Sequence, residues 1–188
     1  MNGKLYLIVG PSGAGKGTII EGIKQNFPDI IFPLSCTTRE MRPTEKPGQV
    51  YFFISKKEFM KRIENHEFLE WAHVHGRDSF YGTLKAPILK ALHSNKKILR
   101  EVDIQGAQSI RELIPAKNLC TIFITVPDWS ILENRILRRC QMSHEELTKR
   151  KLSVIKEMEF ARECDFIVHS NEGKITKAIN EVIKIINK

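Results

Sequence analysis

A glycine-rich loop near the amino terminus constrains the fold of this chain more than any other feature. The loop consists of Gly10, Pro11, Ser12, Gly13, Ala14, Gly15, Lys16, Gly17 and Thr18. It follows the apolar run Leu5–Val9, typical of a buried strand, and precedes apolar residues at helical spacing from Ile19 to Phe27. A G-x-x-x-x-G-K pattern between a strand and a helix predicts backbone N–H groups that bind the phosphates of a nucleoside triphosphate. We expect the Lys16 ammonium to contact the β- and γ-phosphates.

The residue after the loop lysine departs from the usual pattern. It is Gly17, where serine or threonine is usual, and Thr18 follows one position later. Whether Thr18 contacts Mg²⁺ or only a phosphate therefore stays open. A plain glycine turn is the alternative interpretation, but the lysine, the spacing and both flanks argue against it. The loop alone does not identify a second substrate.

Strands and helices alternate along the rest of the chain. The apolar runs Lys97–Asp103 and Cys120–Val126 and the shorter Asp165–His169 predict further core strands. Helical spacing of apolar residues predicts helices around 84–92 and 107–113, and an amphipathic helix over 175–186. Such alternation favours an α/β fold with a parallel sheet covered by helices on both faces. We expect one domain whose core comprises 1–34, 84–128 and 151–188.

Two segments interrupt this alternation. Residues 35–83 are rich in Arg, Pro, Gly and aromatic residues, with the strand-like runs Val50–Ile54 and Phe68–Val74, which predicts a small mixed-β insertion. A capping box, Ser55-x-x-Glu58, predicts a short helix within it. Residues 129–150 contain a helix end, a polar turn and a second capping box, Ser143-x-x-Glu146, which predicts a helical lid.

Charge and cysteine content limit the classes of partner. The chain has 188 residues with 30 Lys and Arg against 22 Asp and Glu, and a net charge of +8. Such a surface attracts polyanions, either nucleic acid or phosphorylated small molecules. No nucleic-acid motif is recognisable, so we expect no nucleic-acid partner. The four cysteines form no C-x-x-C pair, and no signal peptide or membrane-length apolar run occurs, so a reducing cytoplasmic location is expected.

A second phosphate-binding group is expected in the insertion. Arg39 and Arg42 lie three positions apart, and Tyr51 and Tyr81 follow. Two guanidinium groups and two phenols can hold a phosphate monoester, although two arginines in a loop are often only solvated.

The motifs together resemble the guanylate kinase family. They are G-P-S-G-A-G-K-G-T, S-C-T-T-R-E-M-R-P, F-L-E-W-A, Y-G-T and V-D-I-Q-G-A, in this order over essentially the whole chain. The resemblance implies a P-loop kinase fold, and that Arg39, Arg42, Tyr51 and Tyr81 hold the phosphate of GMP. It also implies that Ser35, Glu70, Thr83 and Asp103 recognise guanine. Guanine chemistry agrees, because a carboxylate such as Glu70 accepts from N1–H and N2–H while adenine has no such donor pair.

The resemblance also assigns residues to phosphoryl transfer. The family pattern R-L-x-x-R-G aligns with residues 135–140, with Cys140 in place of the usual glycine. Together with Lys16, the arginines Arg135, Arg139 and Arg150 are implied to neutralise charge on the transferred phosphoryl group, and Arg138 lies beside them. Mg²⁺ is expected to bridge the ATP phosphates, with Glu101 as a ligand through water. Arg100, in a strand position where an apolar residue is usual, has no explanation from sequence.

The expected function is ATP-dependent phosphorylation of GMP, and of dGMP, to the diphosphate in purine nucleotide metabolism. A related kinase with another phosphate acceptor is one alternative. A guanylate-kinase-like interaction module without catalysis is another, although such modules tend to lose the phosphate-loop or acceptor residues present here. The sequence leaves the oligomeric state open, a homo-oligomer included.

Overall fold

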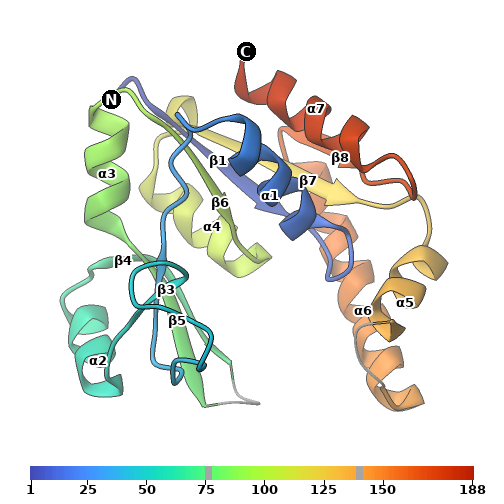
Figure 1. Ribbon diagram of the computed structural model, residues 1–188, viewed down its shortest axis with the longest axis horizontal. Helices are drawn as coiled ribbons and strands as arrows, with labels where there is room; N and C mark the ends of the chain where they lie inside the picture. Colours follow the sequence, from blue (N-terminus) through green and yellow to red (C-terminus); the bar gives the residue numbers. More distant parts are fainter. Residues whose placement is uncertain (75–77, 139–141) are drawn as a thin grey trace.

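The computed structural model describes residues 1–74, 78–138 and 142–188, and its centre is a parallel sheet (Figure 1). Among the described residues the strand order is β6–β1–β7–β8, and neighbouring strands are parallel. The strands are β1 (Lys4–Val9), β6 (Lys97–Glu101), β7 (Leu119–Thr125) and β8 (Phe166–His169). The α/β class and the parallel core sheet predicted from the sequence are therefore confirmed.

Helices cover both faces of this sheet because its central strand is apolar on both sides. Side chains of β1 alternate between the faces. Leu5, Leu7 and Val9 join one buried cluster with residues of α3 (Lys85–His93) and α4 (Ile104–Leu113). Tyr6 and Ile8 join another with residues of α1 (Lys16–Asn26) and α7 (Ile175–Ile186). The Tyr6 hydroxyl donates to the Ile186 carbonyl at 3.0 Å, which fixes α7 against the sheet.

The insertion forms a second sheet with a core of its own. Its order is β3–β2–β5–β4, in which β2 and β3 are parallel and the other pairs antiparallel. Its elements are β2 (Ser35–Thr37), β3 (Tyr51–Phe53), α2 (Lys56–Glu64), β4 (Phe68–Val74) and β5 (Ser79–Leu84). Cys36, Phe59, Phe68 and Phe80 form its buried cluster. The predicted mixed-β insertion is confirmed.

A helical pair, α5 (Trp129–Leu137) and α6 (His144–Phe160), extends from the other side of the core sheet in Figure 1. The predicted capping box at Ser143 is present, because Ser143 Oγ accepts from the Glu146 N–H and Glu146 accepts from the Ser143 N–H. The predicted lid ends at position 150, in the middle of α6, which continues to Phe160. Short 3₁₀ turns, Ala116–Asn118 and Ala161–Glu163, precede β7 and β8.

Three predicted details were wrong at the ends of elements. Strand β6 ends at Glu101 and not at Asp103, because Asp103 caps α4 by accepting the Gly106 N–H at 2.7 Å. Strand β8 begins after Asp165, whose carboxylate accepts from the Thr121 N–H and hydroxyl. The box at Ser55 is only half formed: Ser55 accepts from the Glu58 N–H, while the Glu58 carboxylate accepts from Arg62.

Membrane insertion finds no support in the helices. Within residues 1–74, 78–138 and 142–188, none of them combines the length and the apolar character needed to cross a bilayer.

Candidate active site

The glycine loop lies where the sequence predicts it, between β1 and α1, and its backbone requires glycine at defined positions. Gly10, Gly13 and Gly15 have φ of 139°, 88° and 94°, in the region that side chains rarely adopt. A Cβ at Gly10 would lie 2.1 Å from the Ile124 carbonyl oxygen, because β7 passes directly beside the loop. Gly15 is the N-cap of α1, so the loop leads into the positive end of a helix.

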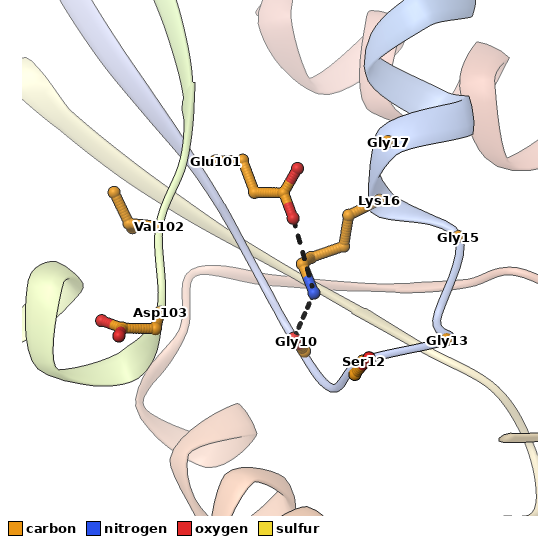
Figure 2. A pocket seen from close by; sticks show the side chains of 9 residues that line it. All are labelled: Gly10, Ser12, Gly13, Gly15, Lys16, Gly17, Glu101, Val102 and Asp103. Atoms are coloured by element: carbon orange, nitrogen blue, oxygen red, sulfur yellow. Dashed lines mark hydrogen bonds and ion pairs between the residues drawn. The ribbon is translucent and has the colours of Figure 1, made fainter. Parts of the chain in front are cut away.

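Lys16 reaches across the opening of this loop (Figure 2). Its Nζ donates to the carbonyls of Gly10 at 2.6 Å and Pro11 at 3.1 Å, and lies 3.7 Å from Glu101 Oε1. A cavity of about 480 Å³ lies here, lined by Gly10, Ser12, Gly13, Gly15, Lys16, Gly17, Glu101, Val102 and Asp103. Its size and its backbone N–H donors suit the phosphates of a nucleotide.

The oxygen donors near the loop fit a metal ion that is bound mainly by a nucleotide. The Glu101 side chain is 45% exposed and lines the loop cavity. In the described part of the chain, no three His, Cys, Asp or Glu side chains gather closely enough to hold a metal by themselves. Mg²⁺ commonly takes one or two carboxylates, water and substrate phosphates, so this donor set suits it. Thr18 is exposed and lines a neighbouring pocket, not the loop cavity.

Three of the four residues predicted to recognise guanine, Ser35, Glu70 and Thr83, lie on the insertion, and the fourth, Asp103, follows β6 in the core. Thr83, on β5, donates its hydroxyl proton to Glu70 Oε1, on β4. Ser35 and Thr83 are buried, and only 12% of the Glu70 side chain is exposed. Burial raises the pKa of Glu70, while the Thr83 hydrogen bond and the charge of Arg100 oppose that rise.

Asp103 has a structural task besides its predicted role. One of its oxygens caps α4 through the Gly106 N–H, and the residue lines the loop cavity. Its charge also raises the pKa of Glu70, so the two carboxylates are close enough to interact. The cap fixes the direction of the Asp103 side chain at the edge shared by insertion and core.

The structure brings Arg39, Tyr51 and Tyr81 of the predicted phosphate clamp together, and it adds a partner that the sequence analysis missed. The Arg39 guanidinium lies 5.5 Å from the ring centre of Tyr51, and the Tyr51 and Tyr81 rings are 5.7 Å apart. Arg39 also donates to the Glu45 carboxylate at 2.8 Å. The same carboxylate accepts from the backbone N–H of the exposed Arg42 at 2.9 Å. These contacts hold the pKa of Glu45 below its usual value. The spacing Arg42-x-x-Glu45 could have indicated the bond between the Arg42 N–H and the Glu45 carboxylate.

A second cavity of about 460 Å³ adjoins the clamp. It is lined by Ser35, Tyr51, Tyr81, Arg100, Glu101 and the residues Ile20, Lys24, Phe32, Pro33, Leu34, Val50 and Leu99. Glu101 lines both this cavity and the loop cavity, so the two are neighbours. Two cavities that share a lining residue can hold two ligands side by side.

The lid arginines are only partly brought to the loop. Arg135, on α5, donates to the Gly13 carbonyl at 3.2 Å and to the Ser170 carbonyl at 3.0 Å. Arg138 lies 3.8 Å from Glu172 and is exposed. Arg150 lies on α6. Arg139 and Cys140 lie outside the described residues.

A third pocket beside the loop was not predicted. Its volume is about 360 Å³, and it is lined by Thr18, Arg135, Arg138, Ile175, the loop glycines Gly13 and Gly15, and the segment 170–173. Ser170 Oγ and Asn171 Oδ1 are buried there without a hydrogen-bond partner. Nothing in the local sequence pattern distinguishes these two residues from an ordinary turn before α7.

The family comparison matches this geometry. The family model described as guanylate kinase matches residues 2–188. The chain belongs to the guanylate kinase family. A guanylate kinase of Thermotoga maritima is 38% identical over 186 residues, covering 99% of this chain and 87% of that protein. A guanylate kinase of Fusobacterium nucleatum is also 38% identical, over 184 residues, covering 98% of this chain and 96% of that protein.

Solved structures agree with the guanylate kinase fold. A guanylate kinase from Anaplasma phagocytophilum has a TM-score of 0.73 at 23% identity, covering 98% of this chain and 85% of that one. A shikimate kinase from Acinetobacter baumannii has a TM-score of 0.52 at 14% identity, covering 98% and 93%. At these identities the likeness concerns the fold alone, and it supports the P-loop kinase architecture.

Proposed function

We propose that this protein transfers the γ-phosphoryl group of ATP to GMP, forming ADP and GDP. Family membership over nearly the whole chain supports this function. The observation that carries it is the meeting of two cavities at Glu101, with the glycine loop lining one and the clamp tyrosines Tyr51 and Tyr81 lining the other. A loop cavity alone would support only nucleotide binding.

The acceptor base is selected by buried hydrogen-bonding groups. Glu70 accepts from guanine N1–H and N2–H, Asp103 accepts a further N2 proton, and a hydroxyl donates to O6. Thr83 gives its proton to Glu70 in this structure, which leaves Ser35 as the donor to O6. Adenine would leave the Glu70 carboxylate facing a lone pair, so AMP should be a poor substrate.

The acceptor phosphate is held by Arg39, Arg42, Tyr51 and Tyr81. Arg39 offers a planar pair of donors that matches a phosphate. Its present partner Glu45 fixes the guanidinium beside Tyr51 before the substrate arrives. The dianionic GMP phosphate then competes for the same donors.

Transfer needs positioning and charge neutralisation more than proton transfer. A GMP phosphate oxygen is already anionic, so it attacks the γ-phosphorus in line without a general base. Lys16, Arg135, Arg139 and Arg150 stabilise charge on the transferred group, and the loop N–H groups hold the β-phosphate. Glu101 is the residue that would hold Mg²⁺ through water, and the ion would supply charge neutralisation between the ATP phosphates.

The remaining assignments are proposals of the same kind. Residues 35–83 form the GMP-binding part, 129–150 the lid, and 1–34, 84–128 and 151–188 the core. Closure of the first two over the core would exclude water and limit hydrolysis of ATP. We propose a cytoplasmic enzyme without nucleic-acid or membrane partners.

A coupled assay of ADP release tests the function directly. With ATP and Mg²⁺, we expect rapid turnover with GMP, slower turnover with dGMP, and turnover with AMP, CMP or UMP lower by roughly 10⁴ in kcat/KM. A preference for another monophosphate would identify a related kinase with a different acceptor. GMP binding by calorimetry without any turnover would identify a binding module instead.

A further inference from the structure

Arg100 occupies an unusual place in the sheet. It lies on β6, in the core, but its guanidinium contacts residues at the border of the insertion. Nη1 donates to the Pro33 carbonyl at 3.2 Å, and Nη2 donates to the Ser35 hydroxyl oxygen and lies 3.8 Å from Glu70 Oε1. Only 19% of the Arg100 side chain is exposed. One guanidinium thus ties β6 to β2 and β4.

The contact with Ser35 determines the direction of a proton. A hydroxyl has one proton to donate and lone pairs to accept with. Since Arg100 donates to Ser35 Oγ, the Ser35 proton remains available for an acceptor in the adjoining cavity, which Ser35 and Arg100 both line. Guanine O6 is such an acceptor.

The contact with Arg100 gives the buried Glu70 carboxylate a counter-charge. Burial raises the pKa of Glu70, and the charge of Asp103 acts in the same direction. Arg100 and the Thr83 hydroxyl act in the opposite direction and favour the carboxylate. Only the carboxylate can accept two N–H donors at once.

Stability alone does not explain an arginine at this position. Replacing a buried ion pair by apolar side chains is often neutral or stabilising. Among the described residues, Arg100 Nε is buried without a hydrogen-bond partner, which carries a desolvation cost. An apolar pair at positions 70 and 100 would avoid that cost, whereas replacing Arg100 alone would leave the Glu70 carboxylate buried without its counter-charge.

We propose that Arg100 is a positioning residue for guanine recognition, which holds Ser35 as a donor to O6 and Glu70 as an acceptor for N1–H and N2–H. The inference rests on the proposed function, because it concerns the acceptor site of that reaction. Arg100 acts through these two side chains, so its removal weakens binding of the base and leaves the phosphoryl-transfer groups in place.

Steady-state kinetics of Arg100→Met test the proposal, with GMP and inosine monophosphate as acceptors. Inosine monophosphate lacks the 2-amino group, so it makes one contact fewer with Glu70. We expect KM for GMP to rise on the order of 10- to 100-fold, with kcat changed less than about threefold and KM for ATP unchanged. The preference for GMP over inosine monophosphate should narrow, and the Tm should fall, because Glu70 stays buried without its counter-charge.

Two further variants keep the test decisive. Lys97→Met removes another cation of β6, at the end of the strand away from Arg100. Lys97 donates to Asn187, so this variant should leave the GMP kinetics unchanged. Arg100→Lys keeps a charge near Glu70 but not the planar pair of donors. Its KM for GMP should therefore lie between those of the wild type and Arg100→Met. If Arg100→Met unfolds, a KM for GMP raised above the wild-type value in folded Arg100→Lys supports the proposal.

The proposal is overturned if a folded Arg100→Met, or Arg100→Lys where the methionine variant unfolds, keeps the wild-type KM for GMP and the wild-type acceptor preference. Failure of the proposed function would look different, because the wild-type protein itself would then show no ATP-dependent turnover of GMP.

Discussion

At the scale of single residues, Lys16 has the most direct link from sequence to chemistry. Its Nζ is held by loop carbonyls and faces Glu101, at the place where ATP phosphates would displace those weaker partners. Lys16→Ala should reduce kcat on the order of 10²-fold or more while leaving the Tm nearly unchanged, because the contact strengthens mainly in the transition state. Lys184→Ala, on the exposed side of α7, is the matched control. A correctly folded Lys16→Ala enzyme with near-normal turnover contradicts the assignment.

Glu70 carries the prediction about base choice. Glu70→Ala should lower kcat/KM for GMP on the order of 10²- to 10³-fold, since each charged hydrogen bond contributes about 1.5–3 kcal/mol. Use of AMP should not fall in parallel, because adenine offers Glu70 no donor pair. Measuring kcat/KM for both nucleotides in wild type, Glu70→Ala and the surface control Glu64→Ala decides the matter. An unchanged ratio of GMP to AMP would remove Glu70 from guanine recognition.

Single residues were predictable where a motif fixes both type and spacing. The loop lies as the sequence implies, because glycine conformations follow local rules. The Tyr51–Tyr81 pair joins strands β3 and β5, which are not neighbours in the sheet, and only the family resemblance indicated it. Arg100 gained its meaning only from a partner distant in sequence: it contacts Ser35, 65 positions away. No local pattern encodes such a contact, so the sequence analysis left Arg100 unexplained.

At the scale of elements, the cap of α6 gives a stability prediction. Ser143→Ala removes the acceptor for the Glu146 N–H and the partner of the capping box, which costs about 1 kcal/mol. For a domain of this size the Tm should fall by roughly 2–4 °C. Ser94→Ala, at the carboxyl end of α3, should lower it less, because no side-chain cap bond of α3 is lost there. Equal shifts in the two variants would show that the box contributes nothing.

Helix α5 presents Arg135 to the glycine loop, where its guanidinium donates to the Gly13 carbonyl. Arg135→Ala should lower kcat at least about tenfold and leave the calorimetric Kd for GMP unchanged, because its contacts are with Gly13 and Ser170 and not with the clamp. Arg162→Ala, an exposed arginine beyond α6, serves as control. Loss of GMP binding with an intact rate would contradict this separation of roles.

Element ends were less predictable than elements. β6 and β8 were expected from apolar runs and α2 from the capping box at Ser55, and each exists. Their ends depend on which polar side chain captures which backbone group: Asp103 caps a helix where strand was expected, and Glu58 pairs with Arg62 in place of its cap. These are competitions among near-equal hydrogen bonds, which periodicity does not resolve.

At the scale of the whole molecule, the core sheet and the insertion are stabilised by different apolar clusters. The core sheet has buried clusters on both faces, while the insertion has its own cluster around Phe59. The glycine loop depends on the former and the acceptor clamp on the latter. We expect this division to let the insertion move toward the core without repacking the cluster that surrounds the loop.

This division predicts that the two substrates respond differently to packing defects. Phe59 is fully buried between Phe68 and Phe80, with ring centres 4.5 Å and 5.5 Å away. Phe59→Ala should loosen the insertion by about 3–5 kcal/mol locally, raise KM for GMP several-fold or more, and leave the Kd for ATP unchanged. Hydrogen exchange should accelerate in β2, β4 and β5 and remain slow in β1 and β7.

Val182→Ala, in the core cluster on the buried face of α7, is the control: it should lower the Tm without a selective effect on GMP. If Phe59→Ala weakens ATP and GMP binding equally, or if exchange accelerates alike in both sheets, the insertion and the core unfold as one unit and the division is wrong.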